Sequence, residues 1–204
     1  MVPLVRYSEA DIPTEQGAFR LVVYRMGQGE HDEHDEHVAL VRGDVRGERV
    51  LCRIHSECLT GEVFGSLKCD CKAQFDAAMA AIAAAERGVI VYLRQEGRGI
   101  GLGNKIRAYA LQATGKDTVE ANVALGFAPD LRSYEQAAAI LGDLGVASVA
   151  LLTNNPDKLA GLERAGVAVA EHVPHWVSKH EHNREYLEVK RAKLGHLDSR
   201  RGTR

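Results

Sequence analysis

The chain has 204 residues, of which 45% are hydrophobic, and its 26 basic and 28 acidic residues leave a formal net charge of −2. This length supports one large domain or two small ones, and the balanced charge excludes a globally basic surface for nucleic acid. No apolar run approaches the roughly 18 residues that a membrane-spanning helix needs, and the N-terminus has no apolar core of signal-peptide length. We therefore expect a soluble, cytoplasmic protein that binds neither nucleic acid nor membranes.

The first quarter of the chain is expected to be rich in β-strands. Residues 19–25, 37–42 and 49–54 have the apolar patterns of strands, and residues 43–47 are typical of a turn. Between the first two strands, residues 30–37 form an acidic run with histidines three apart. Such histidines can gather a metal, but the polar composition and the preceding glycines favour a solvated hairpin loop.

Three of the four cysteines gather just after the third expected strand. Cys58, Cys69 and Cys71 have the spacing C-x10-C-x-C, which suggests a metal site in a reducing compartment rather than a disulfide framework. Three thiolates suit zinc, which prefers tetrahedral sulfur and nitrogen ligation. They leave a fourth position for a water, whose pKa zinc can lower to roughly 7. The spacing therefore predicts an open, catalytic zinc site in the loop after an early strand.

Cys52 is the candidate fourth ligand that would make this site closed and structural. Side chains alternate across a strand, so Val50, Cys52 and Ile54 share one face, while Arg53 and His55 share the other with the start of the motif. We therefore interpret Cys52 as a small core hydrophobe. A closed structural site and a metal-free segment remain the alternatives.

After the cysteine motif the pattern becomes helical and then apolar. Phe75, Met79 and Ile82 recur at helical spacing in an alanine-rich segment that ends near Gly88. Residues 89–93 follow as a nearly continuous apolar run, which is typical of a strand buried on both faces.

A glycine-rich segment, residues 96–105, follows this strand. Glycines at every second position let the backbone approach a ligand closely and turn its N–H groups toward anions. The spacing matches neither a Walker A loop nor a dinucleotide-binding fingerprint, and a glycine-rich connection is often only a connection. Its place after a buried strand favours a nucleotide site, as do the basic residues around it: Arg94, Arg98, Lys105 and Arg107.

The second half of the chain alternates between expected helices and strands. Helices are expected over residues 104–112, 134–144 and, near the end of the chain, 181–194, and strands over residues 146–153 and 167–171.

A further ligand position is expected where the strand over residues 146–153 ends. Asn155 can cap the following helix and Pro156 can be its first residue. Thr153 then lies at the carboxyl end of a strand, where open α/β sheets place ligands.

These elements predict an α/β fold: a mixed sheet with flanking helices and a β-rich N-terminal part. We expect a single domain over residues 1–197 and a disordered tail over residues 198–204.

Five motifs resemble those of GTP cyclohydrolase II, the enzyme family that begins riboflavin synthesis, and they occur in that family's order. They are RIHSECLTG (53–61), CDC (69–71), RQEGRGIGL (94–102), NK (104–105) and TNNP (153–156). The likeness extends from about Ile12 to Leu197. It implies an α/β hydrolase, usually a homodimer, with one Zn²⁺ per subunit and with Mg²⁺ bound to the triphosphate of its substrate.

The implied reaction converts GTP to 2,5-diamino-6-ribosylamino-4(3H)-pyrimidinone 5′-phosphate, formate and pyrophosphate. The family often carries a dihydroxybutanone-phosphate synthase domain in front, for which this chain is expected to have no room.

The resemblance also implies roles for individual residues. The family's zinc ligands correspond to Cys58, Cys69 and Cys71, and its catalytic residues to Tyr109, Asp130 and Arg132. Its nucleotide contacts correspond to Arg53, Ile54, His55, Ser56, Glu57, Gln74, Glu96, Gly97, Arg98, Thr118, Thr153 and Lys158. Glu62 departs from the aspartate that the family often has, Lys68 from its common arginine, and residues 174–176 are unusual; none of these is an assigned position.

The role of Arg132 has three interpretations. The resemblance implies a covalent guanylyl intermediate on Arg132, but a protonated arginine is a poor nucleophile unless Asp130 removes a proton in a dry site. We therefore expect Arg132 to stabilise charge on the phosphates, with Lys158 beside it and with covalent chemistry as an alternative. The third interpretation is an ion pair that only closes a loop.

Tyr109 is expected to face the pocket and to orient the water that releases formate. It lies four residues after Lys105, on the same face of the expected helix. The alternative is that it packs in the core like Ile106.

Three other functions are considered. His55-Ser56-Glu57 is similar to the H-x-E element of zinc deaminases, but the P-C-x-x-C element of that class is absent from the sequence. A zinc-stabilised nucleotide-binding module without turnover is the non-enzymatic alternative. A variant that opens the ring and retains the formyl group is the third.

Overall fold

The computed structural model describes residues 4–26, 36–115, 117–128 and 130–177, without the side chains of Thr118 and Val119. Most of the histidine-rich run, the expected helix over residues 181–194 and the expected tail over residues 198–204 lie outside the described residues.

Within these ranges, seven strands form one sheet in the order β1-β2-β3-β5-β4-β6-β7. The strands are β1 (Leu4–Thr14), β2 (Gly17–Met26), β3 (Glu36–Arg42), β4 (Val50–Ser56), β5 (Gly88–Leu93), β6 (Ser148–Leu152) and β7 (Ala168–Val173). The neighbours from β1 to β5 pair antiparallel, whereas β4 pairs parallel with β5 and β6, and β6 with β7. The sheet is therefore mixed, as the sequence predicts.

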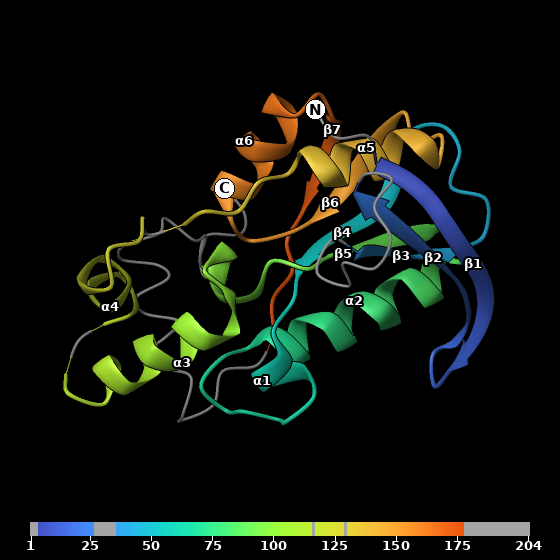
Figure 1. Ribbon diagram of the computed structural model, residues 1–204. Coiled ribbons are helices and arrows are strands. Elements are labelled where there is room, and N and C mark those ends of the chain that lie inside the picture. The colour runs from blue at the N-terminus through green and yellow to red at the C-terminus, as the bar shows by residue number, and fades with distance from the viewer. Residues whose placement is uncertain (1–3, 27–35, 116, 129, 178–204) are drawn as a thin grey trace, which may run out of the picture.

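Helices cover both faces of the sheet. They are α1 (Leu59–Glu62), α2 (Cys71–Ala85), α3 (Gly101–Gln112), α4 (Thr118–Ala124), α5 (Glu135–Asp143) and α6 (Pro156–Arg164). Figure 1 shows α2 on one face and α5 with α6 on the other, while α3 and α4 lie beside the sheet. This three-layer arrangement places the core on the two sides of the central strands.

Strand β5 shows why its sequence is apolar throughout. Val89, Val91 and Leu93 belong to the cluster under α5 and α6, whereas Ile90 belongs to the cluster under α2. Because side chains alternate across a strand, both faces of β5 are buried. Each fully buried side chain of this size stabilises the fold by roughly 1.5–3 kcal/mol relative to its exposed state.

The prediction for Cys52 is confirmed. Its side chain is buried with Val50 and Ile54 in the cluster under α5 and α6. The predicted cap is confirmed as well, because the Asn155 side chain accepts a hydrogen bond from the Asp157 backbone N–H at the start of α6.

Four elements were not predicted: β1, α1, α4 and a 3₁₀ helix over Glu96–Gly99. In addition, α3 begins earlier than expected. Residues 5–11 of β1 are exposed, so their sequence lacks apolar alternation, and the ladder to β2 holds this edge strand in place. α1 and α4 are short elements with little apolar periodicity. α3 begins at Gly101 rather than at residue 104, because the first turn of a helix tolerates glycines that a periodicity search interprets as a loop.

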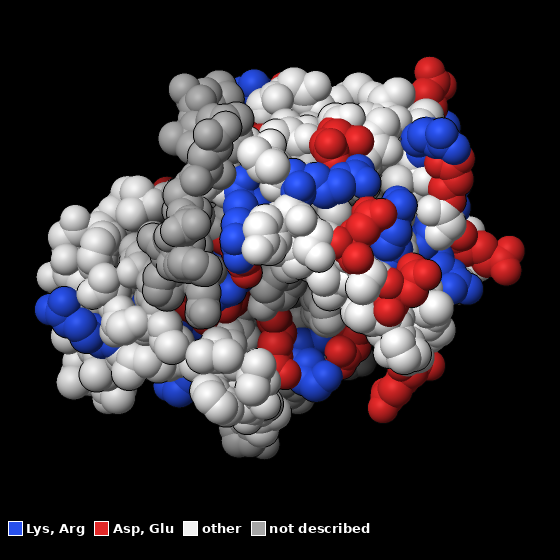
Figure 2. Space-filling model, turned by 45° about the vertical axis from the view of Figure 1, so that its right-hand side comes forward, with Lys and Arg blue, Asp and Glu red and all other residues white. Residues whose placement is uncertain are grey.

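Figure 2 shows how charge is distributed on one face of the molecule. Basic and acidic side chains lie interspersed over the right-hand part of this face. Charged side chains pair in several places among the described residues, such as Arg6 with Asp143 and Arg49 with Glu171, both at 2.7 Å. Separately, no helix among the described residues is long and apolar enough to cross a membrane.

Candidate active site

The candidate site lies where the parallel strands β4, β5 and β6 end. β4 lies between β5 and β6, so the chain goes from β4 to one neighbour and then crosses to the other. Open α/β sheets bind ligands at such a reversal, beyond the carboxyl ends of the strands. Cys58 follows β4, the glycine-rich segment follows β5 and Thr153 follows β6.

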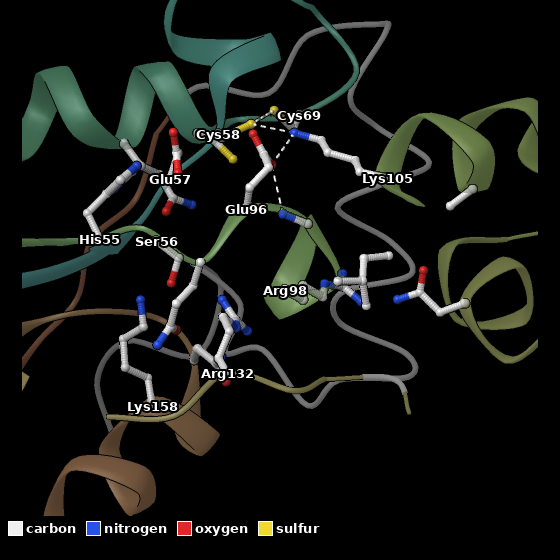
Figure 3. A pocket seen from close by; sticks show the side chains of 18 of the residues that line it. His55, Ser56, Glu57, Cys58, Cys69, Glu96, Arg98, Lys105, Arg132 and Lys158 are labelled. Carbon is white, nitrogen blue, oxygen red and sulfur yellow. Dashed lines mark hydrogen bonds and ion pairs between the residues drawn. The ribbon is translucent and has the colours of Figure 1, made fainter. Parts of the chain in front are cut away.

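A pocket opens at this edge, with about 1060 Å³ of space including its mouth. Residues from several parts of the chain, most of them polar or charged, line it: Arg53, His55, Ser56, Glu57 and Cys58; Cys69, Cys71 and Gln74; Gln95, Glu96, Gly97, Arg98 and Ile100; Lys105, Ala108, Tyr109 and Gln112; Asn122; Arg132; Thr153, Asn154, Asn155 and Lys158. In Figure 3 Cys58 and Cys69 lie at one end of this pocket, and Arg132 and Lys158 lie at the other.

The three predicted sulfur ligands come together in the pocket. The sulfur atoms of Cys58, Cys69 and Cys71 lie within 4.8 Å of one another, and those of Cys58 and Cys69 are 3.7 Å apart. Tetrahedral zinc with bonds of about 2.3 Å places its sulfur ligands about 3.8 Å apart. A Cβ atom at Gly61 would lie 3.0 Å from the Cys69 sulfur and 3.2 Å from the Cys58 sulfur, so glycine leaves the cluster room. These residues therefore fit zinc in geometry and in donor chemistry.

The charge around the cluster is set by the sulfurs themselves and by one lysine. Hydrogen bonds shared with Cys69 and with Cys71, and after them the nearby Lys105 ammonium, lower the pKa of Cys58. The hydrogen bond that Cys69 shares with Cys58 raises the pKa of Cys69. Lys105 Nζ lies 3.2 Å from Cys58 Sγ and 2.8 Å from Glu96 Oε1 (Figure 3).

A second polar cluster, formed by His55, Glu62 and Tyr92, lies against the segment that follows Cys58. His55 Nε2 and Glu62 Oε1 are 2.7 Å apart, and the Tyr92 hydroxyl donates to Glu62 Oε2 at 2.7 Å. The His55 ring stacks on Tyr92 and meets Phe75 edge-on. Burial raises the pKa of Glu62 to about 7. Because Glu62 belongs to α1, this cluster ties the segment after Cys58 to strands β4 and β5.

Buried cations of the pocket are held by backbone carbonyls and amides. Arg53 donates to the Leu152 carbonyl at 2.9 Å and to the Gln74 side-chain oxygen at 2.5 Å. Lys158 Nζ donates to the Ile54 carbonyl at 2.7 Å. Burial lowers the pKa of Arg53 to about 10, so the guanidinium still carries its charge at neutral pH.

The glycine-rich segment has a constrained backbone. Gly97 and Arg98 both have positive φ, at 64° and 62°. Residues with a side chain, such as Arg98, rarely adopt this backbone conformation. The Arg98 carbonyl accepts a hydrogen bond from Leu131 N at 3.0 Å. A Cβ atom at Gly99 would lie 3.1 Å from Leu131 Cβ. The segment therefore packs closely against the loop that carries Asp130 and Arg132.

Asp130 and Arg132 form a forked ion pair within that loop. Arg132 Nε donates to Asp130 Oδ1 at 2.9 Å, and the backbone N–H of Arg132 donates to the same oxygen at 3.0 Å. Burial raises the pKa of Asp130, but the hydrogen bonds from Arg132 outweigh it and hold this pKa below its ordinary value. Arg132 lines the pocket, whereas Asp130 reaches it only through Arg132.

All but three of the residues predicted for the site line this one pocket. Ile54 lies in the core with its side chain, and its carbonyl holds Lys158. Asp130 is an exposed residue that pairs with Arg132 but does not line the pocket, and the side chain of Thr118 lies outside the described part of the chain.

Sequence reasoning missed several lining residues, among them Gln95, Gln112, Asn122 and Asn154. Gln95 and Asn154 lie within the motifs RQEGRGIGL and TNNP, which could have indicated them, whereas Gln112 and Asn122 belong to no motif and no spacing pattern marks them. In the sequence, Glu62 is notable only because the family often has aspartate at this position. The sequence does not indicate that Glu62 forms hydrogen bonds with His55 and Tyr92.

Comparisons with known proteins indicate the family. A family model described as GTP cyclohydrolase II matches residues 5–174. The GTP cyclohydrolase-2 of Histophilus somni is 52% identical over 191 residues, which cover 93% of this chain and 87% of that protein. The riboflavin biosynthesis protein RibBA of Bacillus subtilis is 55% identical over 194 residues, or 94% of this chain and 48% of RibBA.

The chain thus spans about half the length of the RibBA relatives that it matches and most of the length of the shorter relatives. With a family model over most of the described residues and relatives of this length at half identity or more, the chain belongs to the GTP cyclohydrolase II family of enzymes.

Proposed function

We propose that the protein hydrolyses GTP to 2,5-diamino-6-ribosylamino-4(3H)-pyrimidinone 5′-phosphate, formate and pyrophosphate, as the first step of riboflavin synthesis. The observation that carries the proposal is the shared pocket. Three thiolates gather at one end, and the cations Arg132 and Lys158 lie at the other (Figure 3). A purine nucleotide is complementary to this arrangement, because its base carries the ring carbon to be hydrated and its other end carries the phosphates.

Cys58, Cys69 and Cys71 would hold one zinc ion. When bound, zinc would lower the pKa of a water toward about 7 and so supply a nucleophile for guanine C8 near neutral pH. The closed site with four thiolates is disfavoured, because Cys52 is buried in the core and the sulfur group consists of the other three.

At the phosphate end, Arg132, Lys158 and Arg53 would stabilise the negative charge that develops as pyrophosphate leaves. Mg²⁺ would accompany the triphosphate as a further counter-charge. The hydrogen bonds from Arg132 to Asp130 suit a charged guanidinium, which supports charge stabilisation over covalent chemistry at this residue.

Tyr109 would act in the release of formate. Burial raises the pKa of its phenol to about 12, so the phenol keeps its proton at neutral pH and can donate a hydrogen bond. It lines the pocket on the same side of α3 as Lys105, whose Nζ lies 5.7 Å from its ring.

We also propose a homodimer. The family resemblance supports it, and so do three exposed apolar side chains in the segment after α1, those of Val63, Phe64 and Leu67. Sedimentation equilibrium of the purified protein measures the mass of the assembly, and a monomer at micromolar concentration would reject the dimer.

The reaction is tested with zinc-loaded protein, GTP and Mg²⁺, followed by mass spectrometry and assays for formate and pyrophosphate. We expect all three products in equal amounts. GTP consumed without formate would instead indicate the variant that keeps the formyl group. GTP bound and recovered intact would indicate a binding module, and xanthosine triphosphate would indicate a deaminase.

A further inference from the structure

Lys105 is a buried lysine that no assigned step of the reaction uses. The residue is 8% exposed, on the inner side of α3. A buried ammonium is rare in proteins unless it is paired, because desolvation of an unpaired charge is costly. Its partners therefore indicate its role.

One partner of Lys105 is a sulfur of the candidate metal site. Nζ donates to Cys58 Sγ at 3.2 Å, which is a hydrogen-bond distance for sulfur. The other partner is Glu96, whose Oε1 lies 2.8 Å from Nζ. Two of the three donors of the ammonium are thus directed at the protein itself rather than at the space for a substrate.

Glu96 is occupied in the same way. Its Oε1 accepts from Lys105 and from the Gly97 backbone N–H at 2.7 Å, and its Oε2 accepts from the Leu59 N–H at 2.8 Å. Leu59 is the residue after Cys58. The Glu96 carboxylate therefore joins the glycine-rich segment to the residue next to a sulfur ligand, with Lys105 between them (Figure 3).

The charges explain why a cation belongs here. Three thiolates around a divalent zinc ion leave one net negative charge, and Glu96 adds a second nearby. Lys105 is in hydrogen-bond contact with both Cys58 and Glu96, so its loss would remove this contacting counter-charge and destabilise the occupied site. The hydrogen bond to Cys58 Sγ also withdraws electron density from that sulfur, and such outer contacts tune a bound metal.

We propose that Lys105 is a positioning residue of the metal site, which compensates the charge of the zinc–thiolate group and orients Cys58 through a direct N–H···S hydrogen bond. The inference rests on the proposed function in taking the three cysteines as the zinc site. It assigns Lys105 to the metal and the Glu96 carboxylate to the support of Lys105.

The test measures metal binding without GTP. Metal-free wild type, Lys105→Met and Lys105→Gln are titrated with zinc against a chromophoric chelator at one pH, with folding checked by circular dichroism. Loss of an outer contact typically costs about 10–100-fold in metal affinity, and we expect a loss of this size for Lys105→Met. Lys68→Met is the matched control, because it removes another ammonium group from the same region. The Lys68 Nζ lies 5.1 Å from the centre of the Tyr109 ring. This variant should bind zinc like the wild type.

Cobalt(II) in place of zinc gives a second readout that a purely structural role would not change. In Lys105→Met the sulfur loses a donor, so the sulfur-to-cobalt charge-transfer band should move to longer wavelength. Lys105→Gln keeps a donor without the charge, so its affinity should fall while its band moves less.

A folded Lys105→Met that binds zinc within about threefold of the wild type, or whose cobalt band does not move, overturns the inference. If Lys105→Met does not fold, the zinc affinity of Lys105→Gln decides by the same threshold. A wild type that binds zinc and converts GTP while the variants match it rejects only the role of Lys105. A wild type that binds no zinc rejects the proposed function itself.

Discussion

At the scale of single residues, the side of α3 on which a residue lies decides its chemistry. Tyr109 lines the pocket, whereas Ile106 is 48% exposed on the other side of the helix. Ile106 is therefore not a core residue, and it gives no support to the alternative that Tyr109 packs in the core. Tyr109 thus lines the pocket with a side chain whose hydroxyl can form hydrogen bonds.

We predict that Tyr109→Phe still consumes GTP while formate release drops at least tenfold and a formylated pyrimidine nucleotide accumulates. Phenylalanine keeps the ring but removes the hydroxyl that would orient the hydrolytic water, and general acid–base groups typically contribute about 10²–10⁴-fold. Mass spectrometry separates the two products by one formyl group. Normal formate yield from the folded variant would remove Tyr109 from the mechanism.

The four cysteines offer a matched comparison. Replacing Cys58, Cys69 or Cys71 singly with serine should release zinc and abolish ring opening, because a hydroxyl is a poor substitute for a soft thiolate. Cys52→Ser should keep the zinc but lower the free energy of unfolding by about 1–3 kcal/mol, since it buries a hydroxyl in an apolar cluster. Metal analysis and urea unfolding measure the two effects. Zinc loss from Cys52→Ser would show that the site has four thiolates.

At the scale of elements, the glycine-rich segment is positioned by close packing rather than by its own hydrogen bonds alone. Gly99 has φ of 89° and meets Leu131 so closely that a Cβ would lie 3.1 Å from Leu131 Cβ. This contact holds Arg98 next to the loop of Arg132, so the two arginines belong to one packed unit.

We predict that Gly99→Ala lowers the free energy of unfolding by about 2 kcal/mol, from the left-handed backbone and the tight contact together. Gly103→Ala is the control, because Gly103 lies in α3 without positive φ, and a Cβ atom added there would meet nothing within 4 Å among the described residues. It should be neutral or stabilise by up to about 1 kcal/mol. Urea unfolding of both variants measures the difference, and equal stabilities would contradict the packing argument.

At the scale of the whole molecule, His175 joins the end of the sheet to the pocket. Its Nε2 donates to the Gln74 carbonyl at 2.8 Å, and its backbone N–H donates to the Asn154 side chain at 2.8 Å. Burial, and then the charge of Arg53, lower the pKa of His175 to about 4, with His55 and Lys158 as further nearby groups that disfavour its protonation. The folded protein therefore holds this imidazole neutral.

The pH dependence of stability follows from this shift. Between pH 6.5 and 4 the unfolded chain binds a proton at His175 and the folded chain does not, so stability is fully present above pH 6.5 and falls as the pH is lowered. The loss attributable to His175 is about 3 kcal/mol across this window. Urea unfolding of the metal-free protein at both ends of the window, compared with His175→Gln, measures it. An equal loss in the variant would show that other groups cause the pH dependence.

The sequence by itself determined most of the elements and the chemical character of the site. Apolar periodicity located α2 and β5, strand alternation separated Cys52 from the other cysteines, and the motifs indicated the family. These features are local: they depend on spacing along the chain, which the sequence displays directly.

Only the tertiary structure determined which residues from distant parts of the chain are in contact. That Lys105 contacts Cys58, that Glu62 bonds to Tyr92, and that Gly99 packs on Leu131 depends on segments 30 or more residues apart in the chain. The exposed edge strand β1 escaped prediction for the same reason, because backbone pairing with β2 holds it rather than any apolar pattern of its own. Contacts of this kind follow from the path of the chain through the sheet, and the order of residues does not encode them in any local spacing.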